Sequence, residues 1–333
     1  MNLQIVVPCY NEERVLPDAA RQLDAVISRL IESGKISNDS RINFVDDGSR
    51  DRTWALIEQE AKTRNLVAGI RLSRNRGHQN ALLAGMMSVN GDAVITIDAD
   101  LQDDINAIEQ MVNEYLQGYD IVYGIRADRS TDSIFKRNTA ISFYRLLALL
   151  GLELVHNHAD FRLMSRRVIE ALREYREVNL YLRGIVPLIG FPSTTVKYER
   201  KERFAGTAKY TVKPMVKLAV DGITSFSTVP LQIITTFGFI MFAGSIVISG
   251  WVLWATFYTD RAVPGWASTV LPMYFLGGLQ LLCLGIIGAY LGRIYGEVKS
   301  RPRYFIDRTI GLSSQPMPIR QVDSAALHHG SEI

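Results

Sequence analysis

The chain is poor in cysteine, nearly neutral in charge and without the common nucleotide-binding fingerprints. Its two cysteines are Cys9, near the first expected strand, and Cys283, inside an apolar run. No disulfide framework is therefore expected, and a reducing compartment fits. The net charge of +3 is too small to indicate binding to nucleic acid, and we expect no such partner. The sequence has no G-x-x-x-x-G-K-[ST] loop and no strand-linked G-x-G-x-x-G turn, which disfavours P-loop NTPases and Rossmann dehydrogenases.

Two further signals are missing. Residues 1–4 lead directly into an expected strand without a basic or long apolar segment, so we expect no signal peptide. His156 and His158 have no cysteine nearby and do not indicate a zinc site.

The first third of the chain alternates between strand and helix patterns. Apolar, β-branched runs predict strands, and apolar residues at helical spacing predict the helices between them. This alternation predicts an α/β fold with a doubly wound, mainly parallel sheet. The expected strands are 4–8, 41–45, 67–72, 93–97, 120–124 and 194–198, and 159–164 is a short strand or a loop. The expected helices are 16–31, one that begins at 51, 79–89, 105–116, 133–152, 166–173 and 180–189.

Four carboxylates follow the expected strand 93–97 within residues 98–104. Asp98 and Asp100 are two residues apart, which on an extended segment puts both side chains on one face. Such a pair suits a hard cation, Mg²⁺ or Mn²⁺. A solvated acidic turn is the simpler interpretation of an isolated D-x-D motif.

Other polar clusters follow neighbouring strands, and ligands of open α/β sheets bind at the carboxyl ends of strands. These clusters are residues 8–12, Asp46 with Asp47, and the basic loop 74–78. Carboxylates can accept hydrogen bonds from base and ribose, and a metal can neutralise a departing diphosphate. Together the clusters favour a nucleotide diphosphate with a divalent metal.

The second half of the chain has a membrane pattern. Lys209, Lys213 and Lys217 form a basic stripe beside an apolar face, which indicates a helix in the membrane interface or an ordinary surface helix. Residues 229–258 and 270–291 are almost free of charge, and a bilayer span needs about 20 residues. Basic residues lie on the outer flanks of this pair, which places both termini in the cytoplasm by the positive-inside rule.

We therefore expect four segments. They are a cytoplasmic catalytic domain (1–208), an interfacial amphipathic helix (209–228), a two-helix transmembrane anchor (229–296) and a cytoplasmic tail (297–333) that is disordered after about residue 310. The chain would then be an integral protein of the inner (cytoplasmic) membrane. A pore is disfavoured because neither span contains an ionisable residue.

Four motifs in order resemble family 2 glycosyltransferases with the GT-A fold: residues 7–12, 45–53, 74–81 and 98–103. Residues 160–163 and the loop 200–210 before the two spans resemble one branch, the polyprenyl-phosphate glycosyltransferases. That branch includes dolichyl-phosphate mannose synthases and the bactoprenol glucosyltransferases of O-antigen modification. The resemblance covers residues 4 to about 306, and it departs at Asp104–Ile105, where the branch often has prolines.

The resemblance implies a role for each candidate residue. Asp98 and Asp100 would hold the metal, and Asp100 and Asp160 are the catalytic candidates, with Asp160 orienting the acceptor or the sugar. The expected nucleotide-sugar site consists of Pro8, Tyr10, Asn11, Glu12, Asp46, Asp98, Ala99, Asp100 and Gln102. The candidates for the lipid phosphate are Arg126, Arg137, Arg200, Arg203 and Lys209. Each of these arginines alone would also suit a surface ion pair.

The expected reaction is an inverting, metal-dependent transfer of a hexose to undecaprenyl phosphate at the cytoplasmic face. Glucose from UDP-glucose is the first choice, with mannose from GDP-mannose or an aminosugar as alternatives. A processive polysaccharide synthase is less favoured, because no tryptophan follows an arginine as in the Q-x-x-R-W motif. A membrane protein that binds nucleotides without catalysis is the alternative from another class. The resemblance also implies self-association into a homo-oligomer.

Overall fold

The computed structural model describes residues 1–126, 158–177, 182–199 and 266–312, together with 231, 234–240, 243–244, 247, 254 and 258. The chain divides into two compact units, one formed by Met1–Ala99 with the segment from Tyr304, and the other by Asp100–Arg303. Several predicted features lie outside the described residues. These are helix 133–152, the interfacial helix, most of the first span, and Arg137, Arg200, Arg203 and Lys209.

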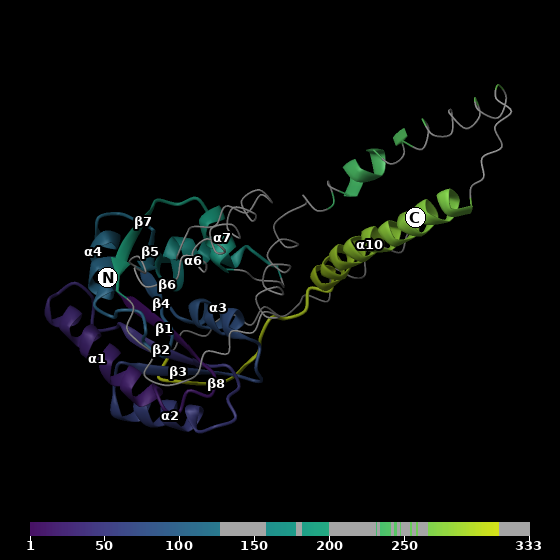
Figure 1. Ribbon diagram of the computed structural model, residues 1–333. Helices are drawn as coiled ribbons and strands as arrows, with labels where there is room; N and C mark the ends of the chain where they lie inside the picture. The colour runs from purple at the N-terminus through teal and green to yellow at the C-terminus, as the bar shows by residue number, and fades with distance from the viewer. Residues whose placement is uncertain are drawn as a thin grey trace, which may run out of the picture. The chain divides into compact units, whose positions relative to one another are not determined.

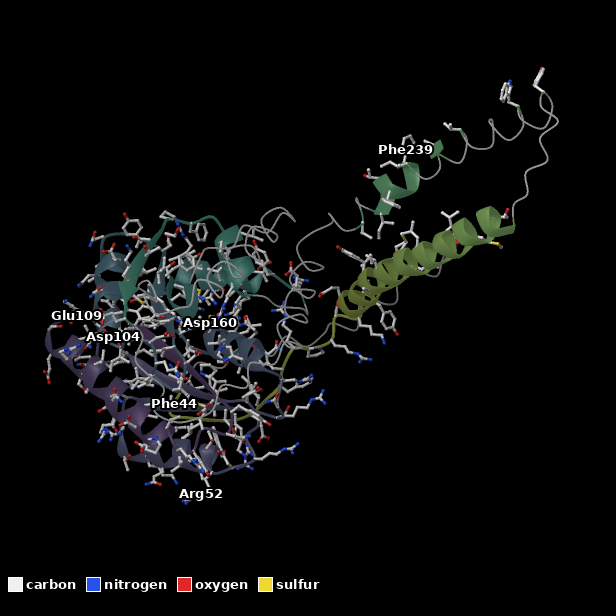
Figure 2. All side chains as sticks on the ribbon, in the orientation of Figure 1. Phe44, Arg52, Asp104, Glu109, Asp160 and Phe239 are labelled. Carbon is white, nitrogen blue, oxygen red and sulfur yellow. The ribbon has the colours of Figure 1, made fainter. Side chains whose placement is uncertain are left out.

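The first unit is built on parallel strands, as predicted. They are β1 (Leu3–Cys9), β2 (Arg41–Asp46), β3 (Val67–Leu72) and β4 (Ala93–Thr96). In the order β4-β1-β2-β3, each neighbouring pair is parallel. The register places Cys9 opposite Asp46, so β1 and β2 end side by side. The strands are almost entirely buried, and Phe44 of β2 has no exposed surface (Figure 2).

Helices cover both faces of these strands, as a doubly wound sheet requires. Helices α1 (Leu16–Glu32) and α2 (Thr53–Thr63) lie on one face, and α3 (His78–Ser88) lies on the other (Figure 1). The close approach of α3 depends on Gly85, because a Cβ added there would lie 2.3 Å from Val6 Cγ1 and 2.8 Å from Val45 Cγ2. A larger residue at this position would push the helix off the sheet.

An edge strand that was not predicted completes the first unit. Strand β8 (Ile306–Ile310) pairs antiparallel with β3, with Gly69 opposite Ile310. Its central residues are exposed and include Asp307 and Arg308. Charged residues are common on edge strands, where they discourage pairing with other chains.

The second unit mixes strand directions. Strand β5 (Ile121–Arg126) pairs antiparallel with β6 (His158–Ser165) and parallel with β7 (Ser193–Tyr198). In the described part of this unit, the structure has the helices α4 (Ala107–Leu116), α6 (Arg166–Arg173), α7 (Leu182–Leu188) and α10 (Trp266–Val298). The segment predicted as a short strand or loop is therefore a strand. Four of the described strand pairings are parallel and two are antiparallel, so the pairing of this α/β fold is mixed with a parallel majority.

The second predicted membrane stretch, 270–291, lies within the 33-residue helix α10 (Figure 1). Across the parts of the chain that the structure describes, no helix is long and apolar enough to cross a membrane. The two membrane spans therefore stay a prediction.

Candidate functional site

Asp46, at the end of β2, is fully buried and held from two sides. Its Oδ1 accepts a hydrogen bond from the backbone N–H of Ser49 at 3.0 Å. Its Oδ2 lies 3.5 Å from Nε of Arg71, whose guanidinium lies 5.8 Å from the ring centroid of Trp54. The carboxylate thus lies next to a cation and has no exposed surface.

The loops after β1 and β2 are fastened together by reciprocal hydrogen bonds. The N–H of Asn11 donates to Ser49 Oγ at 3.0 Å, and the N–H of Arg50 donates to Asn11 Oδ1 at 2.9 Å. The N–H of Glu12 donates to Thr53 Oγ1 at 2.9 Å. Asn11 has φ +56°, a left-handed conformation that asparagine tolerates better than most residues. The bonded loops after β1 and β2 thus form one rim together with Asp46. The predicted residues that lie on or beside this rim are Pro8, Tyr10, Asn11 and Glu12.

Tyr10 is the exposed aromatic residue of this rim, and Asn11 beside it is exposed as well. Tyr10 is 43% exposed, while the flanking Cys9 is buried. An aromatic ring presented in this way can stack on a planar base. Burial and the nearby carboxylates, Glu12 first among them, raise the pKa of the Cys9 thiol, so this cysteine is an inert core residue.

Asp47 connects the loop after β3 to the same rim through hydrogen bonds. Its carboxylate accepts hydrogen bonds from the backbone N–H groups of Arg76 at 2.7 Å and Gly77 at 2.9 Å. Burial raises the pKa of Asp47, although both backbone donors oppose this effect. Gly48 permits the close contact, because it has φ +67° and an added Cβ would lie 2.6 Å from the carbonyl carbon of Arg74. Sequence reasoning placed these clusters at one sheet edge but did not foresee their mutual hydrogen bonds.

The D-x-D segment has one strained residue. Leu101 has φ +44°, and a non-glycine residue in this region costs of order 1–3 kcal/mol and is most common at functional sites. Asp100 Oδ1 accepts the N–H of Gln102 at 3.4 Å, and Gln102 is buried. On the preceding side, Asp98 Oδ1 lies 3.6 Å from Nε2 of His78, the first residue of α3.

The D-x-D donor set fits a divalent cation. Asp98 and Asp100 both keep partly exposed side chains, whereas Ala99 between them is buried. Within the described ranges, no group of three or more His, Cys, Asp and Glu side chains gathers as a metal site. Mg²⁺ is commonly held by one or two carboxylates together with substrate phosphates and water. A two-carboxylate motif is thus sufficient when a diphosphate supplies the remaining oxygens.

In the second unit, Asp160, labelled in Figure 2, forms ion pairs with two arginines. Arg162, two residues along β6 and fully buried, lies with Nη2 3.1 Å from Asp160 Oδ1 and donates from Nη1 to the carbonyl of Leu182 at 3.3 Å. Arg183 of α7 donates to both carboxylate oxygens, from Nε to Oδ1 at 3.2 Å and from Nη2 to Oδ2 at 3.0 Å. The i, i+2 spacing on a strand could have revealed the first arginine, but no local pattern reveals the second.

Arg126 is the only predicted lipid-phosphate residue among those described. Its Nη2 lies 3.5 Å from Oδ1 of Asp103, which also accepts a hydrogen bond from the Tyr198 hydroxyl at 2.7 Å. Burial and the adjacent carboxylate raise the pKa of Tyr198, so the phenol stays protonated as a donor. The buried Asp103 therefore positions Arg126, and neither it nor Tyr198 was predicted.

Comparison with known proteins identifies the family. The family model for glycosyl transferase family 2 matches residues 4–173. The chain is 52% identical over 329 residues to the protein named uncharacterized glycosyltransferase YkoT of Bacillus subtilis (strain 168), covering 98% of this chain and 96% of that protein. It is 39% identical over 310 residues to the bactoprenol glucosyl transferase of Shigella phage SfX, covering 92% and 99%. It is 38% identical over 312 residues to the prophage bactoprenol glucosyl transferase homolog of Escherichia coli (strain K12), covering 92% and 99%.

Proposed function

Because this chain belongs to glycosyl transferase family 2 and is a glycosyltransferase, we propose that it transfers glucose from UDP-glucose to a polyprenyl phosphate, with inversion at the anomeric carbon. The observation that carries this proposal is the likeness, over nearly the full length of both chains, to proteins named bactoprenol glucosyl transferase. The acceptor follows from the name of those relatives. The sugar rests on the same names, and a donor comparison tests it, since hexoses differ from one another only in hydroxyl geometry.

The nucleotide sugar would bind on the rim formed by the loops after β1 and β2. Tyr10 offers an exposed ring for the base, and the hydrogen-bonded loop 11–12 offers polar groups for base and ribose. The fastening of the two loops supports a preorganised site, because little conformational entropy would be lost when a nucleotide binds.

Asp98 and Asp100 would hold Mg²⁺ or Mn²⁺, which when bound supplies positive charge to the diphosphate leaving group. Gln102 would support the same segment, since its backbone N–H is bonded to Asp100. The left-handed Leu101 supports this role, because strained backbone tends to occur where a ligand is gripped.

The acceptor requires positioning more than proton abstraction. A phosphate monoester has a second pKa of about 6, so at neutral pH it is already largely a dianionic nucleophile. The protein must hold two anionic substrates in line, and cationic side chains such as Arg126 would do so. Asp160 is in contact with two arginines, which supports an orienting role over that of a general base.

We further propose that the chain is an integral protein of the cytoplasmic membrane, with the catalytic domain and both termini in the cytoplasm. The supports are the two long uncharged stretches and the large apolar side chains that α10 exposes, among them Met273, Leu284 and Leu291. We also propose that the chain associates with further copies of itself into a homo-oligomer.

Turnover tests the function directly. Membranes or detergent-solubilised full chain are incubated with undecaprenyl phosphate, a divalent metal and labelled UDP-glucose, GDP-mannose or UDP-N-acetylglucosamine in parallel. The expected result is a lipid-linked glucose with release of UDP, made from UDP-glucose alone. A product from another donor would replace the sugar, and the absence of a lipid-linked product with all donors would refute the proposed reaction.

A further inference from the structure

A hydrogen bond between the hydroxyl of Tyr198 and the carboxylate of Asp103 joins two distant segments of the second unit. Tyr198 is the last residue of β7, and Asp103 lies in the loop that follows β4 and precedes α4. The hydroxyl donates to Asp103 Oδ1 at 2.7 Å, although the two residues are 95 positions apart in the sequence. Both residues are buried. A hydrogen bond to a charged acceptor is stronger than one between neutral groups, and burial shields it from competing water.

The ring of Tyr198 is held in place by its neighbours. It meets the ring of Phe161 edge to face, with centroids 5.4 Å apart and ring planes at 76°. Gly124 leaves the space for this arrangement, because an added Cβ would lie 2.9 Å from Cε1 of Tyr198 and 2.9 Å from Cδ1 of Phe161. The hydroxyl is therefore presented from a fixed position, and little side-chain entropy is lost when it bonds to Asp103.

The loop that carries Asp103 also carries Asp100, three residues earlier. Between them Leu101 has φ +44°, a conformation that a non-glycine residue keeps only where its surroundings hold it. The Asp100 carboxylate accepts the N–H of Gln102 at 3.4 Å on one side of this strained residue, and Tyr198 holds Asp103 on the other. The strain of one left-handed residue and a hydrogen bond to a charged group are comparable in free energy. The bond to Tyr198 is thus strong enough to shift the population of the strained conformation.

We infer that Tyr198 is a positioning residue of the metal-binding loop: through Asp103 it holds residues 100–103 in the conformation in which Asp100 binds a divalent cation together with the diphosphate. This inference rests on the proposed function for the identity of the ligand. The affinity of a loop for its ligand falls in proportion to the fraction of the loop that is in the competent conformation. Loss of the hydroxyl should therefore weaken metal and diphosphate binding although no ligand atom is removed.

The first experiment measures the loop in the absence of ligand. Hydrogen exchange of the backbone amides of residues 100–106 is followed by mass spectrometry in the full chain in detergent, for the wild type and for Tyr198→Phe. Phenylalanine keeps the ring and its packing and removes only the hydroxyl. Exchange in these residues should become about 10-fold faster, because loss of a hydrogen bond to a charged group raises the open fraction by at least that factor. Unchanged exchange would overturn the inference.

Ser165→Ala is the matched control. The Ser165 hydroxyl donates to another aspartate of the same unit, Asp120, at the same distance of 2.7 Å. Asp120 precedes β5, whereas Tyr198 is opposite Arg126 at the end of β5. Ser165→Ala should lower the Tm, because Ser165 also caps α6, but exchange in residues 100–106 should stay at the wild-type rate. Equally faster exchange in both variants would indicate a general loosening of the unit and would overturn the positioning role.

The second experiment measures binding without turnover. Mn²⁺ is titrated into each protein in the presence of saturating UDP, and free Mn²⁺ is quantified from its electron paramagnetic resonance signal. Tyr198→Phe should raise the Kd for Mn²⁺ by about 10-fold, whereas Ser165→Ala should change it by no more than about twofold. The same Kd in the wild type and Tyr198→Phe, or no binding of Mn²⁺ by the wild type, would overturn the inference.

The same variant distinguishes positioning from charge. Tyr198→Phe keeps the Asp103 carboxylate, so a role of Asp103 through its negative charge alone predicts unchanged or tighter Mn²⁺ binding, whereas a positioning role predicts weaker binding. Asp103→Asn keeps an acceptor for the hydroxyl, but the neutral hydrogen bond is about half as strong. Exchange of residues 100–106 in Asp103→Asn should therefore lie between the wild type and Tyr198→Phe. If Tyr198→Phe does not fold, Asp103→Asn decides, and exchange at the wild-type rate would overturn the inference.

The two proposals fail separately. If the wild type makes no lipid-linked sugar from any donor, but Tyr198→Phe loosens residues 100–106 and weakens Mn²⁺ binding, the proposed reaction is wrong and the positioning role stands. If the wild type transfers sugar, and Tyr198→Phe exchanges and binds Mn²⁺ like the wild type, the reaction stands and the positioning role is wrong.

Discussion

Substitution of Gly48 tests whether the contact between the loops after β2 and β3 organises the nucleotide rim. Gly48 has φ +67°, and an added Cβ would lie 2.6 Å from both the Arg74 carbonyl carbon and the Asn75 nitrogen. These are backbone atoms, so the clash cannot be relieved by rotation of a side chain. Gly34 is a matched control, because it has φ +70° and nothing within 4 Å of the added Cβ.

The two alanine variants share the conformational penalty and differ only in the clash. A non-glycine residue in the left-handed region costs about 1–2 kcal/mol, which is the expected loss for Gly34→Ala. Forced overpacking adds about 1–3 kcal/mol, so Gly48→Ala should lower the free energy of unfolding by about 2–5 kcal/mol. Since the clash separates the loop at Asp47 from the N–H groups of Arg76 and Gly77, nucleotide binding should weaken as well.

Thermal unfolding of both variants in the same detergent measures the first effect, and titration with UDP measures the second. A change of 1 kcal/mol shifts the Tm of a chain of 150–250 residues by about 2–4 °C and that of this 333-residue chain by less. The expected difference of about 1–3 kcal/mol between the variants is still measurable. The reasoning is refuted if the two variants lose the same stability. It is also refuted if Gly48→Ala binds UDP like Gly34→Ala.

Three further predictions concern the carboxylates. Asp160→Asn should lower the free energy of unfolding by about 3–5 kcal/mol, because it removes a carboxylate that the enclosed Arg162 contacts at 3.1 Å. Arg183→Gln should cost no more than about 1 kcal/mol, because Arg183 is partly exposed, and equal losses on thermal unfolding would contradict this. Burial raises the pKa of Asp47 above its ordinary value of 3.8, so the folded chain keeps this proton to a higher pH than the unfolded chain does. The free energy of unfolding should therefore fall as the pH rises from about 3.8, the ordinary pKa, through the raised pKa of the folded chain. In Asp47→Asn this contribution to the fall should be missing when the same pH series is measured. Asp100→Ala should reduce sugar transfer to below about 1% of wild type without unfolding the chain, and metal-dependent activity that survives would remove Asp100 from the metal site.

The strands and helices of the first unit could be predicted because each has its own local pattern. Helix α1 buries Leu16, Leu23, Ile27 and Leu30 at helical spacing, and the predicted range 16–31 is close to the observed Leu16–Glu32. Strand β8 could not be predicted in this way, since it is five residues long with exposed charges at its centre. Its conformation depends on the edge of β3, to which it pairs from more than two hundred residues away in the sequence.

The candidate site also has a part that local sequence patterns could predict and a part that they could not. Residues that follow a strand within one motif could be predicted to lie at one sheet edge, and the rim of Tyr10, Asn11 and Glu12 with Asp46 does so. Contacts between motifs have no local pattern. The hydrogen bond from Tyr198 to Asp103 spans 95 positions, and the fork of Arg183 on Asp160 spans 23. Only the fold brings such partners together.

These contacts change the meaning of the acidic clusters from which the metal hypothesis began. A buried carboxylate already bonded to a cation or to backbone donors cannot bind a metal without leaving those partners, at a cost of several kcal/mol. That condition holds for Asp46, Asp47, Asp103 and Asp160. Asp98 and Asp100 differ, because their side chains stay partly exposed, 42% in the case of Asp98. The number of carboxylates is thus a poor argument for a metal, and exposure is a better one. Within residues 98–104 it leaves Asp98, Asp100 and Asp104 as candidates, and the D-x-D spacing favours the first two.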